Sequence, residues 1–231
     1  MDTNNSNINN LAIPMVYIQG GSFDMGSNDG NDIEKPVHRV TVSSFYMGKY
    51  QVTQGQWRSL MGNNPSYFQN CDDCPVENIS WYHVQDFIDM LNKKTGKTYR
   101  LPKEAEWEYA SRGGNSSRGY TYSGSNELHH IAWFDDNSRN KTHPVGQKQA
   151  NELGLYDMSG NVWEWCQDWY GSDYYANSPT ENPQGPSTGY YRLQRGGSWL
   201  QNAKACRVAH RDVNPPDHTN GIHGFRLVLD P

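Results

Sequence analysis

The segment at residues 160–170 constrains the fold of this chain more than any other, and it reads GNVWEWCQDWY. Three tryptophans and one tyrosine fall within these eleven residues, interrupted by Glu164 and Asp168. Aromatic rings carry a large apolar area, and removing that area from water drives burial. We therefore predict that the segment lies in the protein core, with two carboxylates set into it.

A second segment, residues 195–226, is expected to pack against the first. It contains RGGSW at 195–199, CRVAHR at 206–211 and GFR at 224–226, with small and polar residues between them. Fixed motifs thus alternate with positions that carry no obvious structural demand. We predict that its arginines, Arg195, Arg207, Arg211 and Arg226, hold the backbone of this segment in place.

Composition favours one large, loop-rich domain. Of the 231 residues only 35% are hydrophobic, yet there are 8 Trp, 15 Tyr and 22 Gly, which indicates an aromatic core rather than a bundle of Leu-rich helices. We expect a flexible tether at 1–13 and a single domain at 14–231. The net charge is −5 and no basic tract is present, so nucleic acid is not favoured as a partner.

The sequence predicts no direct membrane span and leaves the location of the protein open. No apolar run approaches the roughly 18 to 20 residues that a spanning helix needs. The first ten residues are polar and lack the features of a signal peptide. Two expectations remain: a cytoplasmic protein, or one at the cell surface or outside the cell whose export or lipoprotein signal, with a lipid anchor, is missing from this sequence.

Short strands and helices can be placed from local patterns. Alternating and apolar runs predict strands at 15–18, 39–42, 45–50, 191–194 and 225–229, and the last two of these are expected to pair near the first. Thr53 and Gln56 form a capping-box pattern that opens a helix, and Ser80 precedes a helix at 81–92. Pro102 predicts a third helix at 103–111. Residues 113–182 show few periodic signals and are expected to form long irregular connections.

The four cysteines permit two disulfides without requiring either. Cys71 and Cys74 are spaced like a redox pair or half of a zinc site, but no second Cys-x-x-Cys accompanies them. A structural clip of the loop, or two plain thiols, is the preferred interpretation. Cys166 and Cys206 lie in the two segments that should touch, so we predict a buried disulfide or a close thiol pair between them.

The motifs, taken in order, resemble the formylglycine-generating-enzyme (sulfatase-modifying factor) branch of the C-type lectin fold. They are GGSFDMG at 20–26, YQVTQ at 50–54, PVENISW at 75–81, RLPKEAEWEY at 100–109, GNVWEW at 160–165, RGGSW at 195–199 and GFR at 224–226. The resemblance covers roughly residues 14–229. It implies an α+β, C-type lectin-like domain with a few short strands and two to three helices.

The resembled enzymes act through two cysteines five residues apart that work with copper. Aligned on this chain, the two positions fall at about Ala203 and Val208, and neither is cysteine. Cys206 lies nearby but out of register, without a partner five residues away. The eight histidines show no metal-ligand spacing beyond one adjacent pair. We therefore expect no copper and no enzymatic activity.

The resemblance also implies a structural calcium ion. Its ligands in the family, carried over to this sequence, are Asp157, Gly160, Val162 and Glu164. Hard oxygen donors of this kind suit calcium. The alternative is that Asp157 and Glu164 simply accept hydrogen bonds from amides of the turn.

Residues 192–229 are similar to the variable region of target proteins of diversity-generating retroelements, in which mutagenesis of adenines in asparagine codons randomises surface residues. We predict such freely varying positions at Leu200, Asn202, Ala205, His210, Asp212, Val213, Asn214, His218, Thr219, Asn220, Gly221, Ile222 and His223. All thirteen carry residues reachable from an asparagine codon in that way. Gln201 and Lys204 lie between them and are not reachable.

This resemblance predicts a non-catalytic variable protein that binds a protein or a cell-surface structure. Trp199 and the thirteen free positions would make the contacts. An ordinary hydrophilic loop is the simpler interpretation of the same residues. The functional alternatives are a formylglycine-generating oxidase acting on a sulfatase cysteine, and a structural lipoprotein subunit that uses the same fold.

Overall fold

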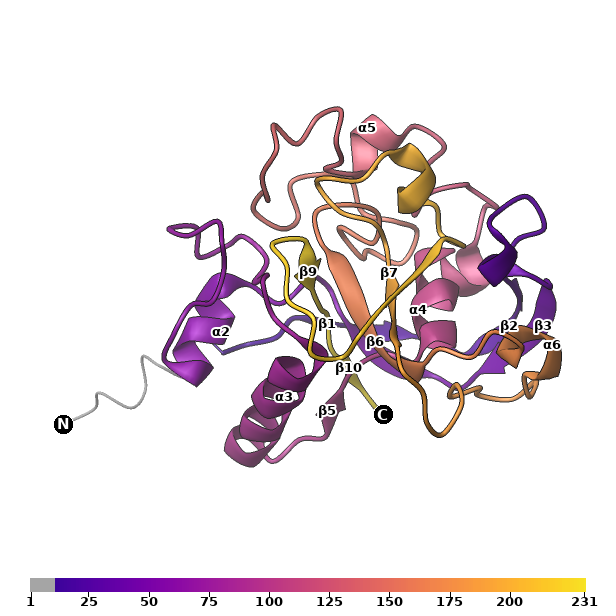
Figure 1. The fold of residues 1–231 in the computed structure, drawn as a ribbon, viewed down its shortest axis with the longest axis horizontal. Coiled ribbons are helices and arrows are strands. Elements are labelled where there is room, and N and C mark those ends of the chain that lie inside the picture. The colour runs from indigo at the N-terminus through magenta and orange to yellow at the C-terminus, as the bar shows by residue number, and fades with distance from the viewer. Residues whose placement is uncertain (1–10) are drawn as a thin grey trace.

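A computed structural model describes residues 11–231 and contains three small sheets (Figure 1). The first has the order β1 (Met15–Ile18), β4 (Phe45–Gly48), β10 (Val228–Leu229) and β5 (Tyr99–Arg100), and all neighbours are antiparallel. β10 therefore lies between β4 and β5. The prediction that the last two strands return close to the first is confirmed for β10 and wrong for the strand predicted at 191–194, which belongs to the third sheet.

The second sheet pairs β2 (Gly21–Met25) with β3 (His38–Val42). The third has the order β8 (Arg211–Asn214), β7 (Arg192–Arg195), β6 (Trp163–Trp169) and β9 (His223–Gly224). β6 is antiparallel to β7 and parallel to β9. The two segments that were expected to pack together are thus neighbouring strands of one sheet.

The aromatic segment is a strand, whereas an irregular connection was expected there. β6 escapes detection because it is covered on both faces, so its sequence does not alternate between apolar and polar residues. Trp165 belongs to the apolar cluster that contains Trp57 and Phe87, and its neighbour Cys166 belongs to the cluster that contains Trp107. Successive side chains of a strand point to opposite faces. β6 therefore separates two cores.

Helices cover the two sides of this central strand. In Figure 1, α2 (Gln54–Met61) and α3 (Trp81–Thr95) lie on one side, and α4 (Glu104–Ser111) lies on the other with β2 and β3. The remaining short helices are η1 (Asp32–Glu34), η2 (Gly114–Ser116), α5 (Leu128–Ile131), α6 (Tyr174–Asn177) and η3 (Ala203–Cys206).

The capping signals placed the helix starts well. The Thr53 side chain accepts a hydrogen bond from the Gln56 amide, and Ser80 does the same for His83, so both predicted N-caps are confirmed. α3 extends to Thr95, three residues beyond the predicted end. α4 begins after Lys103, one residue later than predicted.

Residues 1–10 of the predicted tether lie outside the described residues, and the prediction is wrong for the remainder. The Leu11 side chain is buried in the cluster around Trp57. The Ala12 carbonyl accepts a hydrogen bond of 3.0 Å from Gln56 Nε2. Packing and a backbone hydrogen bond thus hold this stretch on α2. Within residues 11–231, no helix is long and apolar enough to cross a bilayer.

Cys71 and Cys74 form a disulfide, so the interpretation as a loop clip is confirmed. The predicted pairing of Cys166 with Cys206 is wrong, because both are buried free thiols in different clusters. Cys166 faces the α4 side of β6. Cys206, on η3, instead packs against Leu128, Ile131 and Phe134.

Candidate ligand-binding face

Five of the thirteen predicted free positions have exposed side chains, and we call them the C-terminal face: Leu200, Asn202, His218, Thr219 and Asn220. They come from the stretch before η3 and the loop between β8 and β9. Five others are partly exposed: His210, Asp212, Val213, Asn214 and Gly221. Trp199 is also partly exposed, and its indole Nε1 donates to the Gly221 carbonyl at 2.9 Å. That bond ties the two stretches together.

Three predicted surface positions are wrong, because Ala205, Ile222 and His223 are 7%, 8% and 2% exposed. Ala205 and Ile222 pack on Trp163 beneath Trp199. His223 pairs with Trp163 across β9 and β6, and burial, followed by the nearby His218, lowers the pKa of its imidazole to about 3. His223 is therefore a neutral core residue. The three positions were predicted because their residues can arise from an asparagine codon, and that criterion does not depend on whether a side chain is buried.

Arg195 fixes the backbone that leads into β8. Its guanidinium is fully buried and donates to the carbonyls of Val208, at 3.1 Å, and Ala209, at 2.9 Å. It also forms an ion pair with Glu108 on α4. One side chain thus anchors residues 208–209 to a helix nearly a hundred positions earlier in the chain.

Arg211 and Arg207 fix the next stretch from two sides. Arg211 is bidentate to Glu104, at 2.6 and 2.8 Å, and Arg207 is bidentate to Glu34, at 3.0 and 2.6 Å. Burial alone would raise the pKa of Glu34, but hydrogen bonds from His210 and Arg207 hold it at about 2. Glu34 therefore stays ionised, and it ties η1 to the segment that follows η3.

Arg226 completes the set at the far end of the segment. It is bidentate to Glu164, at 2.6 and 2.7 Å, and donates to the Gly48 carbonyl at 3.0 Å. Trp107 Nε1 donates to the same Glu164 carboxylate at 2.7 Å. The four arginines that were predicted to hold the frame thus all pair with carboxylates that are themselves almost fully buried.

Part of the surface beside these residues comes from the N-terminal third of the chain, which the sequence did not indicate. A groove of about 560 Å³ lies between residues 29–31 and residues 201–210, and Asn202, Arg207 and His210 line it. The loop at 29–31 is held there because the Asn31 amide donates to Glu34, the partner of Arg207. A polar loop of this kind carries no sequence signal for such a position.

The loop after α2 adds aromatic side chains next to the C-terminal face. Phe68 packs edge-on against Trp199 with ring centroids 5.2 Å apart, and Tyr67 packs edge-on against Phe68. Tyr67 is 76% exposed. An exposed tyrosine beside a partly exposed tryptophan is typical of protein-binding surfaces, which are enriched in both residues.

The structure brings the four predicted calcium ligands around one point. The carbonyl oxygens of Asp157, Gly160 and Val162 and the Glu164 carboxylate all lie 3.0 to 3.4 Å from the Gln51 amide nitrogen. The Gln51 nitrogen carries only two hydrogens, so it cannot satisfy all four oxygens at once. In the part of the chain that the structure describes, one oxygen of the buried Asp157 carboxylate has no hydrogen-bond partner. The oxygen atoms are of the kind that bind a hard cation, but a cation at this point has to displace the Gln51 side-chain amide. Asp157 contributes its carbonyl to this point, whereas the family pattern expects its side chain.

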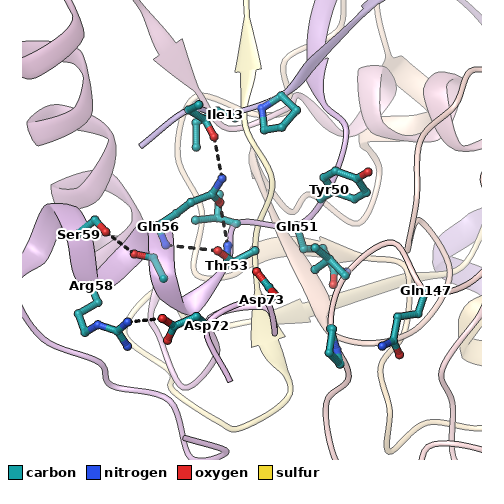
Figure 2. Close-up of a pocket in the computed structure, with 16 residues that line it drawn as sticks. Ile13, Tyr50, Gln51, Thr53, Gln56, Arg58, Ser59, Asp72, Asp73 and Gln147 are labelled. Carbon is teal, nitrogen blue, oxygen red and sulfur yellow. Dashed lines mark hydrogen bonds and ion pairs between the residues drawn. The ribbon is translucent and has the colours of Figure 1, made fainter. Parts of the chain in front are cut away.

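A pocket of about 720 Å³ borders this site but is separate from the C-terminal face. Figure 2 shows Gln51, Tyr50 and Gln147 along one part of it, and the ion pair of Arg58 with Asp72 along another. None of the predicted free positions lines it.

The positions that would carry the cysteine pair of the resembled enzymes hold Ala203 and Val208 in the fold. Cys206 is buried, and burial raises the pKa of its thiol to about 12. Burial also raises the pKa of Cys166. Thiolates are the nucleophiles and the copper ligands of cysteine chemistry, and both of these thiols stay protonated at neutral pH.

Comparisons with known proteins agree with the motifs. The family model described as "Sulfatase-modifying factor enzyme 1-like domain" matches residues 3–231. The chain is 34% identical to "Chaperone protein LppX" of Paenibacillus barcinonensis, over 93% of this chain and 88% of that protein. It is 30% identical to the "Formylglycine-generating enzyme" of Thermomonospora curvata, over 96% of this chain and 95% of that protein. It spans only 38% of "Serine/threonine-protein kinase pkn1" of Chlamydia caviae, at 36% identity.

Among solved structures, "Treponema denticola variable protein 1" superposes with a TM-score of 0.88 at 33% identity, covering 94% of this chain and 95% of that one. The predicted α+β fold of the C-type lectin-like, formylglycine-generating-enzyme type is confirmed, and so is the resemblance to a variable protein.

Proposed function

This chain belongs to the sulfatase-modifying factor enzyme 1-like family, and we propose that it is a member that binds a ligand and does not catalyse a reaction. The ligand would be a protein or a cell-surface structure held on the C-terminal face. One observation carries the proposal: the exposed side chains at 200, 202 and 218–220 lie before and after the stretch 207–211, whose backbone is held by buried arginine–carboxylate pairs.

Such a division of labour is what a diversified binding surface needs. Side chains that contribute nothing to the fold can be exchanged, provided that other residues fix the backbone. The similarity to a protein named variable protein supports this proposal. Tyr67 would add a constant aromatic contact beside the exchangeable ones.

Replacing Leu200, Asn202, His218, Thr219 and Asn220 together with serine is expected to change the free energy of unfolding by less than about 2 kcal/mol, because exposed substitutions cost little. Urea denaturation measures this. The matched control, Arg207→Met, removes one frame arginine and should cost more than the five exposed changes combined. A serine variant that fails to fold would contradict the proposal.

The same logic can be tested for binding. A library randomised at these five positions and selected against an immobilised protein such as lysozyme should yield binders that remain folded. Sequencing the DNA downstream of the gene tests the retroelement origin, which predicts a near-copy repeat of the 3′ region and a reverse transcriptase gene.

A formylglycine-generating oxidase is the second candidate, favoured by the enzyme relative with 30% identity. Incubation with copper and a Cys-x-Pro-x-Arg peptide should give no aldehyde product by mass spectrometry, since the two thiols are buried and lie in separate clusters. Aldehyde formation that is lost in a Cys206→Ser variant would overturn the binding proposal. A structural lipoprotein subunit is the third candidate, and it predicts no selectable binding at the C-terminal face.

We further propose that Asp157, Gly160, Val162 and Glu164 hold a structural calcium ion. Calcium at 100 times its dissociation constant would stabilise the fold by about 2.7 kcal/mol, which raises Tm by roughly 5 to 10 °C for a chain of this size. Differential scanning calorimetry in calcium and in EDTA measures the shift. Magnesium at the same concentration is the control, and identical Tm values in all three conditions would exclude the site.

A further inference from the structure

Arg192, at the start of β7, differs from every frame arginine in its surroundings. It is 9% exposed, and its guanidinium carbon lies 3.8 Å from the ring centroid of Trp81 and 3.5 Å from that of Trp169. The indoles occupy the faces of the guanidinium, where cation–π attraction favours the charge. Only the N–H groups at its edge remain available for hydrogen bonds.

Those N–H groups are poorly used within residues 11–231. One guanidinium nitrogen donates to the Gln167 carbonyl, while the Nε is buried without a partner. Arg195, Arg211 and Arg226 each have a carboxylate within ion-pair distance, and among the described residues Arg192 has none. A buried charge that lacks a counter-ion is costly.

The nearby acidic groups do not fill that role. Burial lowers the pKa of Arg192 to about 10, against the opposing effect of Asp168 and then Tyr82, so the side chain is still a cation at neutral pH. Burial and then Glu104 raise the pKa of Asp168 to about 8, so that carboxyl is mostly protonated at pH 7. Its Oδ2 is in any case bound to the Glu104 amide at 2.9 Å.

Arg192 lines a pocket of about 260 Å³. Lys103 provides a second cation, Gln184 and Ser187 provide polar groups, and Trp169 forms an apolar wall. Among residues 11–231, no carboxylate lines the pocket. Two cations, neutral polar groups and a flat ring are what recognition of a small anionic molecule requires.

We propose that this pocket binds a small ligand carrying a carboxylate or phosphate group. The anionic group would accept hydrogen bonds from the edge of the Arg192 guanidinium and would also contact the Lys103 ammonium group. The pocket includes none of the C-terminal face, so the proposal is independent of the proposed function. A sugar acid or a phosphate fits the same chemistry, and the test separates them.

Tryptophan fluorescence provides the readout, because Trp81 and Trp169 lie against Arg192. Titration with inorganic phosphate, D-glucuronate and D-glucose is expected to give a saturable change with one or both anions and none with the neutral sugar. A larger change with glucuronate indicates a sugar acid, and a response to phosphate alone indicates a phosphate. Binding should also raise Tm, since it stabilises only the folded state.

Two variants test the assignment of residues. Lys103→Gln removes one charge from a partly exposed site and should weaken binding about tenfold, as expected for loss of one charged hydrogen bond. Arg192→Lys keeps the charge but loses the planar edge, and it should abolish the response. Lys141→Gln, an exposed lysine that does not line this pocket, is the matched control and should bind as the parent does.

Equal responses to glucuronate and glucose, or unchanged affinity in Lys103→Gln, would overturn the proposal. If Arg192→Lys does not fold, Lys103→Gln and the anion-dependent Tm of the parent protein still decide it. A flat titration with both anions at concentrations up to about 50 mM also overturns it, because charge-assisted contacts to two cations should give an affinity tighter than that.

Discussion

Replacing Arg195 with methionine is expected to lower the free energy of unfolding by about 3 to 5 kcal/mol, the range found when one partner of a buried ion pair is removed. The substitution leaves the buried Glu108 with Arg112 and the Gly26 amide as partners, and it removes the donors to the carbonyls of Val208 and Ala209. Urea denaturation at pH 7 measures the loss. Because these carbonyls precede β8, we also expect the amides of residues 208–214 to exchange hydrogen faster.

Arg39→Met is the matched control for this experiment. Arg39 also pairs with a carboxylate, Asp24, but the two side chains are 58% and 66% exposed. An exposed pair contributes about 0 to 1 kcal/mol. Equal losses in the two variants would show that Arg195 does not hold the frame.

Asp168→Asn is expected to make the protein more stable than the parent at pH 8. Burial, and then the nearby Glu104, raise the pKa of Asp168 to about 8 from a usual value of 3.8, and Arg211 only partly opposes this. Between pH 3.8 and about pH 8, Asp168 therefore holds a proton in the folded state that it has released in the unfolded chain. Stability therefore falls as pH rises through this window.

The size of the effect follows from the proton affinity. Each tenfold difference in proton affinity between the folded and unfolded states corresponds to about 1.4 kcal/mol. The free energy of unfolding of the parent should therefore fall by on the order of 4 kcal/mol between pH 4 and pH 8 through this one group. Asparagine cannot ionise, yet its carbonyl can still accept the hydrogen bond from the Glu104 amide. Urea denaturation at pH 4, 6 and 8 should show the two proteins equal at the lowest pH and diverging above it.

Asp89→Asn provides the comparison, since Asp89 is exposed on α3 and should leave the pH dependence of stability unchanged. Parallel stability curves for Asp168→Asn and the parent would mean that Asp168 is ionised in the folded protein across this range.

The sequence predicted those elements whose signals are local. Thr53 and Ser80 cap their helices because the capping hydrogen bond needs only a side chain and an amide three residues later. β6 was missed because both of its faces are covered, with Trp165 in one core and Cys166 in the other, and that arrangement is fixed by α3 and α4 from elsewhere in the chain. The Cys166–Cys206 pairing failed for a related reason, because contact between two segments of the chain does not determine on which side of β6 each thiol lies.

In the candidate site, too, residues within recognisable motifs could be predicted and contacts between distant parts of the chain could not. The arginines of the frame could be predicted because they lie in motifs that the family resemblance identified. The loops around Asp29 and Tyr67 could not, since their places beside Arg207 and Trp199 depend on contacts made across more than 120 residues of chain. Burial of Ala205, Ile222 and His223 likewise depends on Trp163 and its neighbours beneath them.

The position of β10 has a consequence for synthesis of the protein. Residues 228–229 fill the space between β4 and β5, so the first sheet is incomplete until they emerge from the ribosome. Every residue of the C-terminal face is translated before them. A truncated product that ends anywhere within that face therefore lacks an interior strand of the first sheet, and we expect it to misfold and to be degraded.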